Sequence, residues 1–298
     1  MNYRQWLLKL YRSTYRLSPV KYGLSRIASK LRPFLVSGRG EHEALLRQTR
    51  LGSQGKSAAG FLAQLDLRDR IQFMMYARGC HEPATERVFA EKLEKNCCFV
   101  DAGANIGYFS LLAASLSPSA RIFSFEPLPK NVVALHENIR LNGFTNIAVV
   151  EKALGEVSGA AWIEAPDPIR ESGWNTIWPV KPENASNNCI VQIMKLDEFL
   201  EGARAPTVDF MKIDVEGNEL AVLKGARLAL EAPGRRQLLV EINEPCLVAQ
   251  GTSGAEVNDF LLQRGYACFR IRRNGSITPC GAADIKNSDG GNYYYVKR

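Results

Sequence analysis

The residues between Phe99 and Phe109 combine a carboxylate with a glycine-rich turn, a pattern that suits a nucleotide cofactor. Asp101 ends an apolar run, and Gly103 and Gly107 follow where a Cβ would hinder a tight turn or the close approach of a ligand. Glu126 ends a second apolar run farther along, where a carboxylate can bind both hydroxyls of a ribose. These residues predict a first β-α-β unit that holds an adenosine-type ligand.

The charge before the turn distinguishes between two adenosine cofactors. A dinucleotide places its pyrophosphate on a bare helix N-terminus, and its fingerprint is G-x-G-x-x-G. Here the turn reads Asp101-x-Gly103-x-Asn105-x-Gly107. A carboxylate at this position repels a pyrophosphate and suits a sulfonium and an α-amino group. The pattern therefore favours S-adenosylmethionine over NAD. The alternative is that the segment binds no cofactor and is an ordinary strand-turn-helix in which the acidic residue occurs by chance.

Polar residues follow two later apolar runs and are candidates for methyl-transfer chemistry: Asp214, Glu216, Glu241 and Asn243. Methyl transfer to an alcohol needs the acceptor oxygen held at about 3–3.5 Å from the methyl group, and the alcohol must lose its proton. One of the three carboxylates is a candidate base. Alternatively, Asp214, Glu241 and Asn243 bind Mg²⁺, which lowers the pKa of the acceptor hydroxyl.

The elements that must position these residues alternate along the chain from Cys97 onward. Strands are expected near 97–101, 121–126, 146–152, 207–213, 237–242, 266–271 and 293–296, and helices near 106–116, 130–141, 217–230 and 254–264. Residues 160–194 read as a hairpin with a long tip, and 61–96 as mainly helical after a strand-like run at Arg70–Tyr76. This alternation implies an α/β fold with a parallel sheet, which binds ligands at the carboxyl ends of its strands.

Four motifs in this order resemble the FkbM family of class I methyltransferases: the 101–110 turn, the strand end at Glu126, the helix end at 138–142, and the 212–219 segment. The resemblance covers roughly residues 80–245. It implies a Rossmann-like sheet of seven strands, with the last antiparallel and helices on both faces. It also implies that Asp101, Gly103, Asn105, Gly107 and Glu126 hold S-adenosylmethionine, with Ala153 and Leu154 beside the adenine. Family members methylate a hydroxyl, commonly of a sugar or polyketide.

Two further segments are candidates for the acceptor side of the site. His81 and Glu82 stand where the family often has an acidic residue near the cofactor, so Glu82 is a substrate candidate and His81 a second candidate base, although a lone histidine is more often structural. The segment 166–188 is longer than a simple connecting turn needs to be. Its Trp174, Asn175 and Trp178 are expected to recognise the acceptor. The alternative is that these indoles only pack the loop down.

Charge divides the chain into two parts. Residues 1–40 hold nine lysines and arginines and no acidic residue, whereas the whole chain carries a net charge of +7. Trp6, Leu7, Leu10 and Tyr11 recur at helical spacing among them, which predicts a basic amphipathic helix. We therefore expect an arm and linker over 1–60 and a methyltransferase domain over 61–298. The arm either lies on an anionic membrane surface or packs on the domain or a partner.

Composition narrows the class of protein. The seven cysteines are odd in number and lack C-x-x-C spacing, which argues against a disulfide framework and a zinc site and favours the cytoplasm. The slightly acidic body disfavours nucleic acid as substrate. We expect an O-methyltransferase that acts on a glycan, glycolipid or secondary metabolite. The rival classes are an NAD-dependent oxidoreductase, for which no Tyr-x-x-x-Lys pair follows the fourth strand, and a non-catalytic adenosine-binding module.

Overall fold

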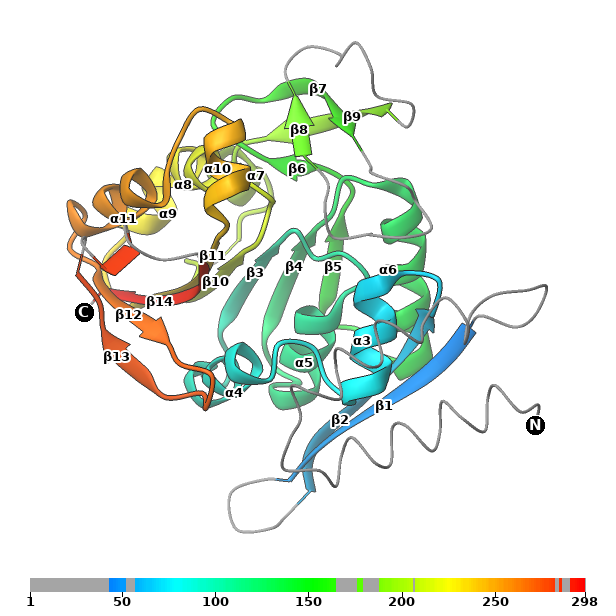
Figure 1. Ribbon diagram of the computed structural model, residues 1–298. Helices are drawn as coiled ribbons and strands as arrows, with labels where there is room; N and C mark the ends of the chain where they lie inside the picture. The colour runs from blue at the N-terminus through cyan, green and yellow to red at the C-terminus, as the bar shows by residue number, and fades with distance from the viewer. Residues whose placement is uncertain are drawn as a thin grey trace.

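A mixed, mostly parallel sheet of eight strands forms the centre of the protein in a computed structural model (Figure 1). The structure describes residues 43–51, 57–164, 176–178, 188–205, 207–281, 284–285 and 290–297. Along the sheet the strands are β13 (Ile277–Pro279), β12 (Ala267–Ile271), β14 (Gly291–Lys297), β11 (Arg236–Ile242), β10 (Phe210–Ile213), β3 (Cys98–Ala102), β4 (Arg121–Phe125) and β5 (Ile147–Val150).

The directions of these strands confirm the expected fold class. β3, β4, β5, β10 and β11 run parallel to their neighbours, and β14 is antiparallel to β11 and β12. The strand count differs from the expected seven, because β13 adds an eighth, antiparallel strand beside β12. With only three residues, β13 is too short to show a hydrophobic period.

Alternation along the strands divides the core between the two faces of the sheet. Phe99 and Phe210 face α4 (Pro83–Lys92) and α5 (Tyr108–Leu116), and α6 (Pro129–Asn142) lies beside α5. Val100 and Met211 face the opposite set of helices. That set comprises α7 (Leu196–Gly202), α8 (Glu219–Gly225), α9 (Arg227–Glu231), α10 (Glu244–Ala249) and α11 (Gly254–Leu262). Because side chains alternate with period two, Asp101 and Lys212 follow Phe99 and Phe210 on the α5 face.

The run expected as a short strand at Arg70–Tyr76 is instead a helix, α3 (Arg70–Arg78). The backbone N–H of Gln72 donates to the Asp69 carboxylate at 2.8 Å, which caps the helix at its start. Gly79 ends the helix with a φ of 77°. Two caps of this kind and the burial of Phe73, Tyr76 and neighbouring residues outweigh the apolar alternation that suggested a strand.

Two smaller sheets flank the central one. β1 (Glu43–Leu51) and β2 (Ser57–Asp66) pair antiparallel, which differs from the linker expected over residues 51–60. β6 (Ala153–Leu154), β7 (Gly159–Glu164), β8 (Thr176–Trp178) and β9 (Asn188–Met194) form the other sheet. β7 and β9 are the two arms of the expected hairpin. Trp174, Asn175 and the basic arm over 1–40 lie outside the described residues.

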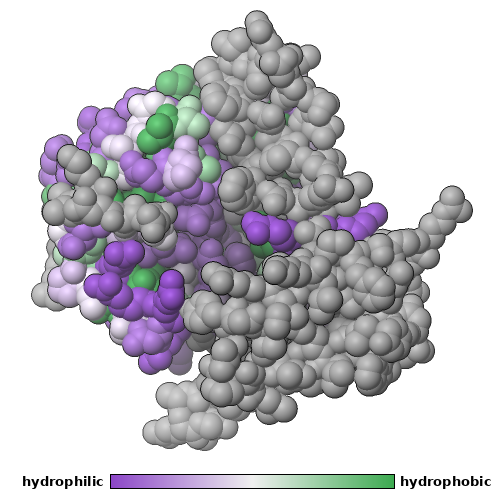
Figure 2. Space-filling view, in the orientation of Figure 1, coloured by the Kyte–Doolittle hydropathy of each residue, from purple (hydrophilic) through white to green (hydrophobic). Residues whose placement is uncertain are grey.

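The visible surface over α10, α11, β12 and β13 is mostly hydrophilic, with separate apolar spots (Figure 2). Exposed large apolar side chains are scattered over several elements, for example Val133 on α6, Leu228 on α9 and Val248 on α10. Within the described part of the chain, the helices are all too short or too polar to cross a membrane.

Two asparagines of α6 join β2 to the rest of the domain. Asn142 exchanges two hydrogen bonds of 2.7 Å with the backbone of Leu62. Asn138, which is fully buried, accepts from the N–H of Gln64 at 2.7 Å and donates to the carbonyl of Ile106 at 3.0 Å. Asn138 therefore connects β2 and α6 with the glycine-rich turn.

Replacing Asn138 should destabilise the whole domain. We expect Asn138→Ala to lower the free energy of unfolding by about 1–3 kcal/mol, because buried backbone groups lose these hydrogen bonds. Denaturant titration measures the loss. Glu137→Ala, at the exposed neighbouring position, is the control and should stay within about 0.5 kcal/mol of the wild type. Equal stabilities of the two variants would contradict the role given to Asn138.

Candidate functional site

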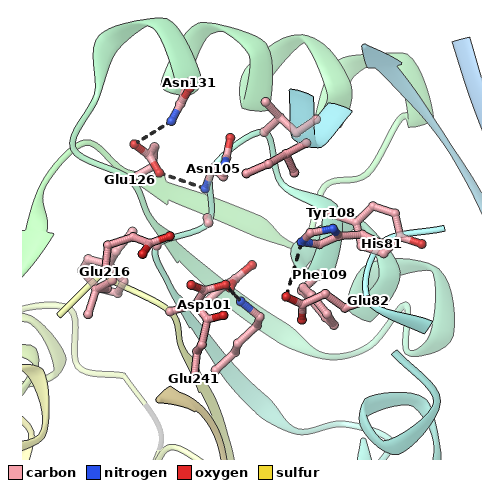
Figure 3. A pocket seen from close by; sticks show the side chains of 18 of the residues that line it. His81, Glu82, Asp101, Asn105, Tyr108, Phe109, Glu126, Asn131, Glu216 and Glu241 are labelled. Carbon is pink, nitrogen blue, oxygen red and sulfur yellow. Dashed lines mark hydrogen bonds and ion pairs between the residues drawn. The ribbon is translucent and has the colours of Figure 1, made fainter. Parts of the chain in front are cut away.

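A cavity of about 410 Å³ opens at the carboxyl ends of the central strands. Its lining includes Asp101 near the end of β3, Gly103 after β3, Glu126 after β4, and Asp214 after β10. Figure 3 shows Glu126 and Asn105 on one side and His81 and Glu82 on another, with Glu216 and Glu241 below Glu126. This is where open α/β sheets bind ligands, as the sequence predicted.

The glycine-rich turn approaches neighbouring segments so closely that two glycines are required. Gly103 has a φ of +82°, and a Cβ there would overlap the carbonyl oxygen of Asp214. Gly107 has a φ of +92°, and a Cβ there would overlap the side chain of Leu135 on α6. The turn therefore keeps its backbone at the cavity wall, with no side chain at Gly103 between a ligand and the sheet.

Glu126 presents a carboxylate that the turn itself holds in place. Its Oε2 accepts the N–H of Asn105 at 2.8 Å, and its Oε1 accepts the N–H of Leu128 at 3.0 Å and Asn131 Nδ2 at 3.2 Å. Burial raises the pKa of Glu126 to about 7 despite these donors. Since a carboxylate has about four acceptor positions, one remains for a ligand. Ala153 and Leu154, both buried, line the same cavity.

Lys212 is a buried cation at the floor of the cavity. Its Nζ lies 2.6 Å from Asp214 Oδ2 and 4.7 Å from the centre of the Phe109 ring, and the residue is 3% exposed. Asp101 lies opposite Lys212 in the β3–β10 register and accepts a hydrogen bond from Ser110 Oγ at 2.6 Å. Burial alone would lower the pKa of Lys212, but the carboxylates of Asp214 and Asp101 raise it above its ordinary value.

Three carboxyl groups meet beside this cation with unequal protonation. Burial would raise the pKa of Asp214, but Lys212 and a hydrogen bond from Glu241 lower it to about 2. The Asp214 carboxylate, together with burial, raises the pKa of Glu241 well above its ordinary value. Burial, followed by the Asp214 charge, raises the pKa of Glu216 to about 8. At neutral pH Asp214 is therefore ionised and Glu216 is mostly protonated, and the pKa of Glu241 is shifted in the same direction as that of Glu216.

Glu219 has a structural role beside the cavity. It is fully buried, and its Oε1 accepts the backbone N–H groups of Val215 and Gly217, both at 3.2 Å. These bonds hold the loop in which Glu216 adopts a φ of 52°. Glu219 therefore shapes the loop without facing the cavity.

His81 stands at the cavity wall between aromatic rings and a carboxylate. Its ring centre lies 5.5 Å from that of Tyr108 and 6.1 Å from that of Phe109, both edge-on. Its Nε2 lies 3.9 Å from Glu82 Oε1. Burial lowers the pKa of His81, and the Glu82 carboxylate offsets this effect only in part. The imidazole is therefore neutral at physiological pH and able to accept a proton.

The set of residues expected to bind Mg²⁺ is only partly brought together. Oxygens of Asp214, Glu216 and Glu241 lie within 4.8 Å of one another. Asn243 instead directs its Nδ2 at Glu216 Oε2, at 3.4 Å. The Lys212 ammonium already provides a positive charge against Asp214, so a divalent cation would have to compete with Lys212 for that carboxylate.

Sequence reasoning missed the contribution of α3 to the site. Arg70, Ile71, Met74 and Arg78 all line the cavity. Their spacing of three and four residues is the signal that would have identified them, had the segment been read as a helix. Of the expected acceptor-binding residues, Glu82 lines the cavity, Trp178 lies in β8 with its backbone opposite Trp162, and Trp174 and Asn175 are outside the described residues.

The raised pKa of Glu216 predicts a pH-dependent stability of the ligand-free protein. A carboxyl whose folded-state pKa is raised from 4.5 to about 8 contributes stability that is present below pH 4.5 and is lost as the pH rises through about 8. Glutamine cannot ionise. We therefore compare the free energy of unfolding of Glu216→Gln with that of the wild type at two pH values. The difference should shift in favour of the variant by on the order of 1–2 kcal/mol between about pH 5 and about pH 9. Denaturant titrations at both pH values measure the difference, with the exposed Glu201→Gln as control, and a difference independent of pH would refute this assignment.

About half of the sequence matches known methyltransferases. A model of the methyltransferase FkbM domain matches residues 101–268. The hexuronic acid methyltransferase AglP of Haloferax volcanii is 31% identical over 147 residues, which cover 49% of this chain and 56% of that protein. Methyltransferase 1 of Beauveria bassiana is 28% identical over 141 residues, which cover 42% of this chain and 57% of that protein. The chain therefore spans little more than half the length of either relative.

Solved structures show a weaker likeness. The precorrin-6y C5,15-methyltransferase of Geobacter metallireducens has a TM-score of 0.41 and 15% identity, over 74% of this chain and 89% of that chain. The fibrillarin of Aeropyrum pernix, solved with S-adenosylmethionine, has a TM-score of 0.39 and 13% identity, over 68% of this chain and 67% of that chain. The family model covers more than half of the 298 residues and includes the glycine-rich turn, Glu126 and the acidic cluster. The chain belongs to the FkbM methyltransferase family.

Proposed function

We propose that this protein transfers a methyl group from S-adenosylmethionine to a hydroxyl of a saccharide or a similar hydroxylated small molecule. The observation that carries the proposal is a single cavity that joins Glu126 and the glycine-rich turn to His81 and the Asp214–Lys212 pair. A relative whose name specifies a hexuronic acid supports a saccharide acceptor. Glycolipids and secondary metabolites with a free hydroxyl are acceptors of the same chemistry.

The cofactor side of the cavity fits the chemistry of S-adenosylmethionine. Glu126 retains an acceptor position for a ribose hydroxyl, and the absence of a Cβ at Gly103 lets the turn pack against the backbone of Asp214 at the cavity wall. Lys212, the cation beside Asp101 and Asp214, is already paired with Asp214, so it offers little attraction to a pyrophosphate. When bound, the cofactor supplies a methyl group on a positively charged sulfur.

His81 is the better base among the candidates. A base works best when its pKa lies near the working pH, whereas the pKa of Asp214 is about 2. The raised pKa values of Glu216 and Glu241 favour their protonated forms, which cannot act as a base. As the oxygen-carbon bond forms and the sulfur-carbon bond breaks, the hydroxyl proton passes to His81, and Glu82 stabilises the imidazolium. Asp214 remains ionised and helps position the acceptor.

This proposal requires no metal ion. Lys212 already compensates the charge of Asp214, and a neutral imidazole removes the need to lower the pKa of the hydroxyl through Mg²⁺. The arm over residues 1–40 lies outside the described residues, and its attachment to anionic membrane surfaces stays a prediction.

Glu126 provides the test of the cofactor assignment. We expect the wild type to bind S-adenosylhomocysteine but not NAD in calorimetry. Glu126→Ala should weaken that binding by about tenfold or more, because hydrogen bonds to a charged group contribute about 1.5–3 kcal/mol. Glu201→Ala, at an exposed position, is the control. Unchanged affinity in a folded Glu126→Ala protein would contradict the ribose assignment.

His81 provides the test of the proposed chemistry. Transfer of tritiated methyl from S-adenosylmethionine to methyl glucuronoside and methyl glucoside measures activity. We expect His81→Gln to lose about 10²–10⁴ in rate while keeping its affinity for S-adenosylhomocysteine. The wild-type rate should rise with pH through a pKa below 6.5 and then level off, and EDTA should not change it. Full activity in His81→Gln, or a rate restored only by Mg²⁺ after EDTA, would rule out His81 as the base.

A further inference from the structure

One wall of the cavity carries positive charge that the proposed reaction does not use. Arg70, Met74 and Arg78 of α3 are spaced four residues apart, so they lie along one face of the helix, and all three line the cavity. Arg78 is three residues before His81, the proposed base. The two are close enough for the Arg78 charge to contribute to the lowered pKa of His81.

Arg78 is half-buried at the cavity wall. Lys212 pairs with Asp214, and Arg236 lies 3.6 Å from Asp209 and donates to two backbone carbonyls. The Nε atoms of Arg78, Arg236 and Arg264 are buried without a hydrogen-bond partner in the described part of the chain, and of these three arginines only Arg78 lines the cavity. A buried donor without a partner is unfavourable, and a ligand that accepts hydrogen bonds relieves that cost.

We propose that Arg78 binds a carboxylate of the acceptor, so that the enzyme methylates a hydroxyl of a sugar acid or of a similar hydroxy acid. This inference rests on the proposed function. A guanidinium binds a carboxylate through two parallel hydrogen bonds. Lys212, which also lines the cavity, is already paired with Asp214. The acceptor carboxylate therefore turns toward α3.

The rest of the lining suits the body of such an acceptor. Ile71 and Met74 of α3, with Ile163 and Ile177 of the small sheet, provide apolar contacts, and small-molecule sites are mostly apolar with few polar groups. The methionine part of the cofactor also carries a carboxylate. Arg78 belongs to the segment that ends at His81, whereas Glu126 and Asn131 mark the ribose position on the other side (Figure 3). This placement assigns Arg78 to the acceptor.

The test compares two sugars that differ only in the carboxylate. The protein is saturated with S-adenosylhomocysteine and titrated with methyl glucuronoside and with methyl glucoside, which has a neutral hydroxymethyl group at the same carbon. We expect the glucuronoside to bind at least about tenfold more tightly. Arg78→Met should abolish that preference and leave the Kd for S-adenosylhomocysteine unchanged. Arg227→Met, which removes an exposed arginine of α9, should change neither.

Each other outcome has a defined meaning. Equal binding of the two sugars by the wild type, or binding of neither, overturns the proposal. A loss of affinity for S-adenosylhomocysteine in Arg78→Met also overturns it, because Arg78 then serves the cofactor. If the wild type does not bind S-adenosylhomocysteine, the proposed function fails. The same sugar titration of the ligand-free protein then tests, independently of the cofactor, whether Arg78 binds the carboxylate.

Discussion

The buried ammonium group of Lys212 determines the electrostatics of the whole cavity. Strand alternation places Lys212 on the same face as Phe210, and the parallel register sets it beside Asp101 of β3. Its 2.6 Å contact with Asp214 keeps that carboxylate ionised. Asp214 in turn raises the pKa of the neighbouring Glu241. One cation therefore sets the protonation of the acidic cluster, and a buried pair of this kind is costly to break.

The two sides of the cavity are held in different ways. On the Glu126 side the backbone fixes the geometry, because Asn105 and Leu128 donate backbone N–H groups to the carboxylate and Gly103 approaches Asp214 directly. On the α3 side, side chains dominate. Tyr108 donates a hydrogen bond of 2.5 Å to Glu86, and the ring of Tyr108 contacts that of His81 edge-on. In such a site, substitutions in the half formed by side chains can change the acceptor, while the half formed by the backbone keeps its geometry for the cofactor.

Much of this arrangement could be predicted from the sequence, because strong local signals carry it. Buried parallel strands read as short apolar runs, so β3, β4 and β10 were predicted to within a few residues. The turn at Gly103 and Gly107 was predictable because only glycine suits it. The helix α3 was not predictable, because the alternation of Ile71, Phe73 and Met75 is typical of a strand. Only the caps at Asp69 and Gly79 indicate a helix.

Protonation states and long-range contacts were beyond the sequence for a different reason. The lowered pKa of Asp214 depends on Lys212 lying 2.6 Å away, which only the folded register creates. The buried Nε of Arg78 likewise depends on how α3 packs. Arg78 could not be grouped with the site from the sequence, because its place at the cavity depends on α3 being a helix. Glu216 and Glu241 could be grouped, because both stand near the carboxyl ends of neighbouring strands.

A crystal structure of the protein with S-adenosylmethionine would test the central claim most directly. The account predicts that the ribose hydroxyls lie within hydrogen-bond distance of Glu126 and that the sulfonium methyl points into the space between His81 and Asp214. A cofactor bound outside this cavity, or one whose methyl group faces away from both His81 and Asp214, would contradict it.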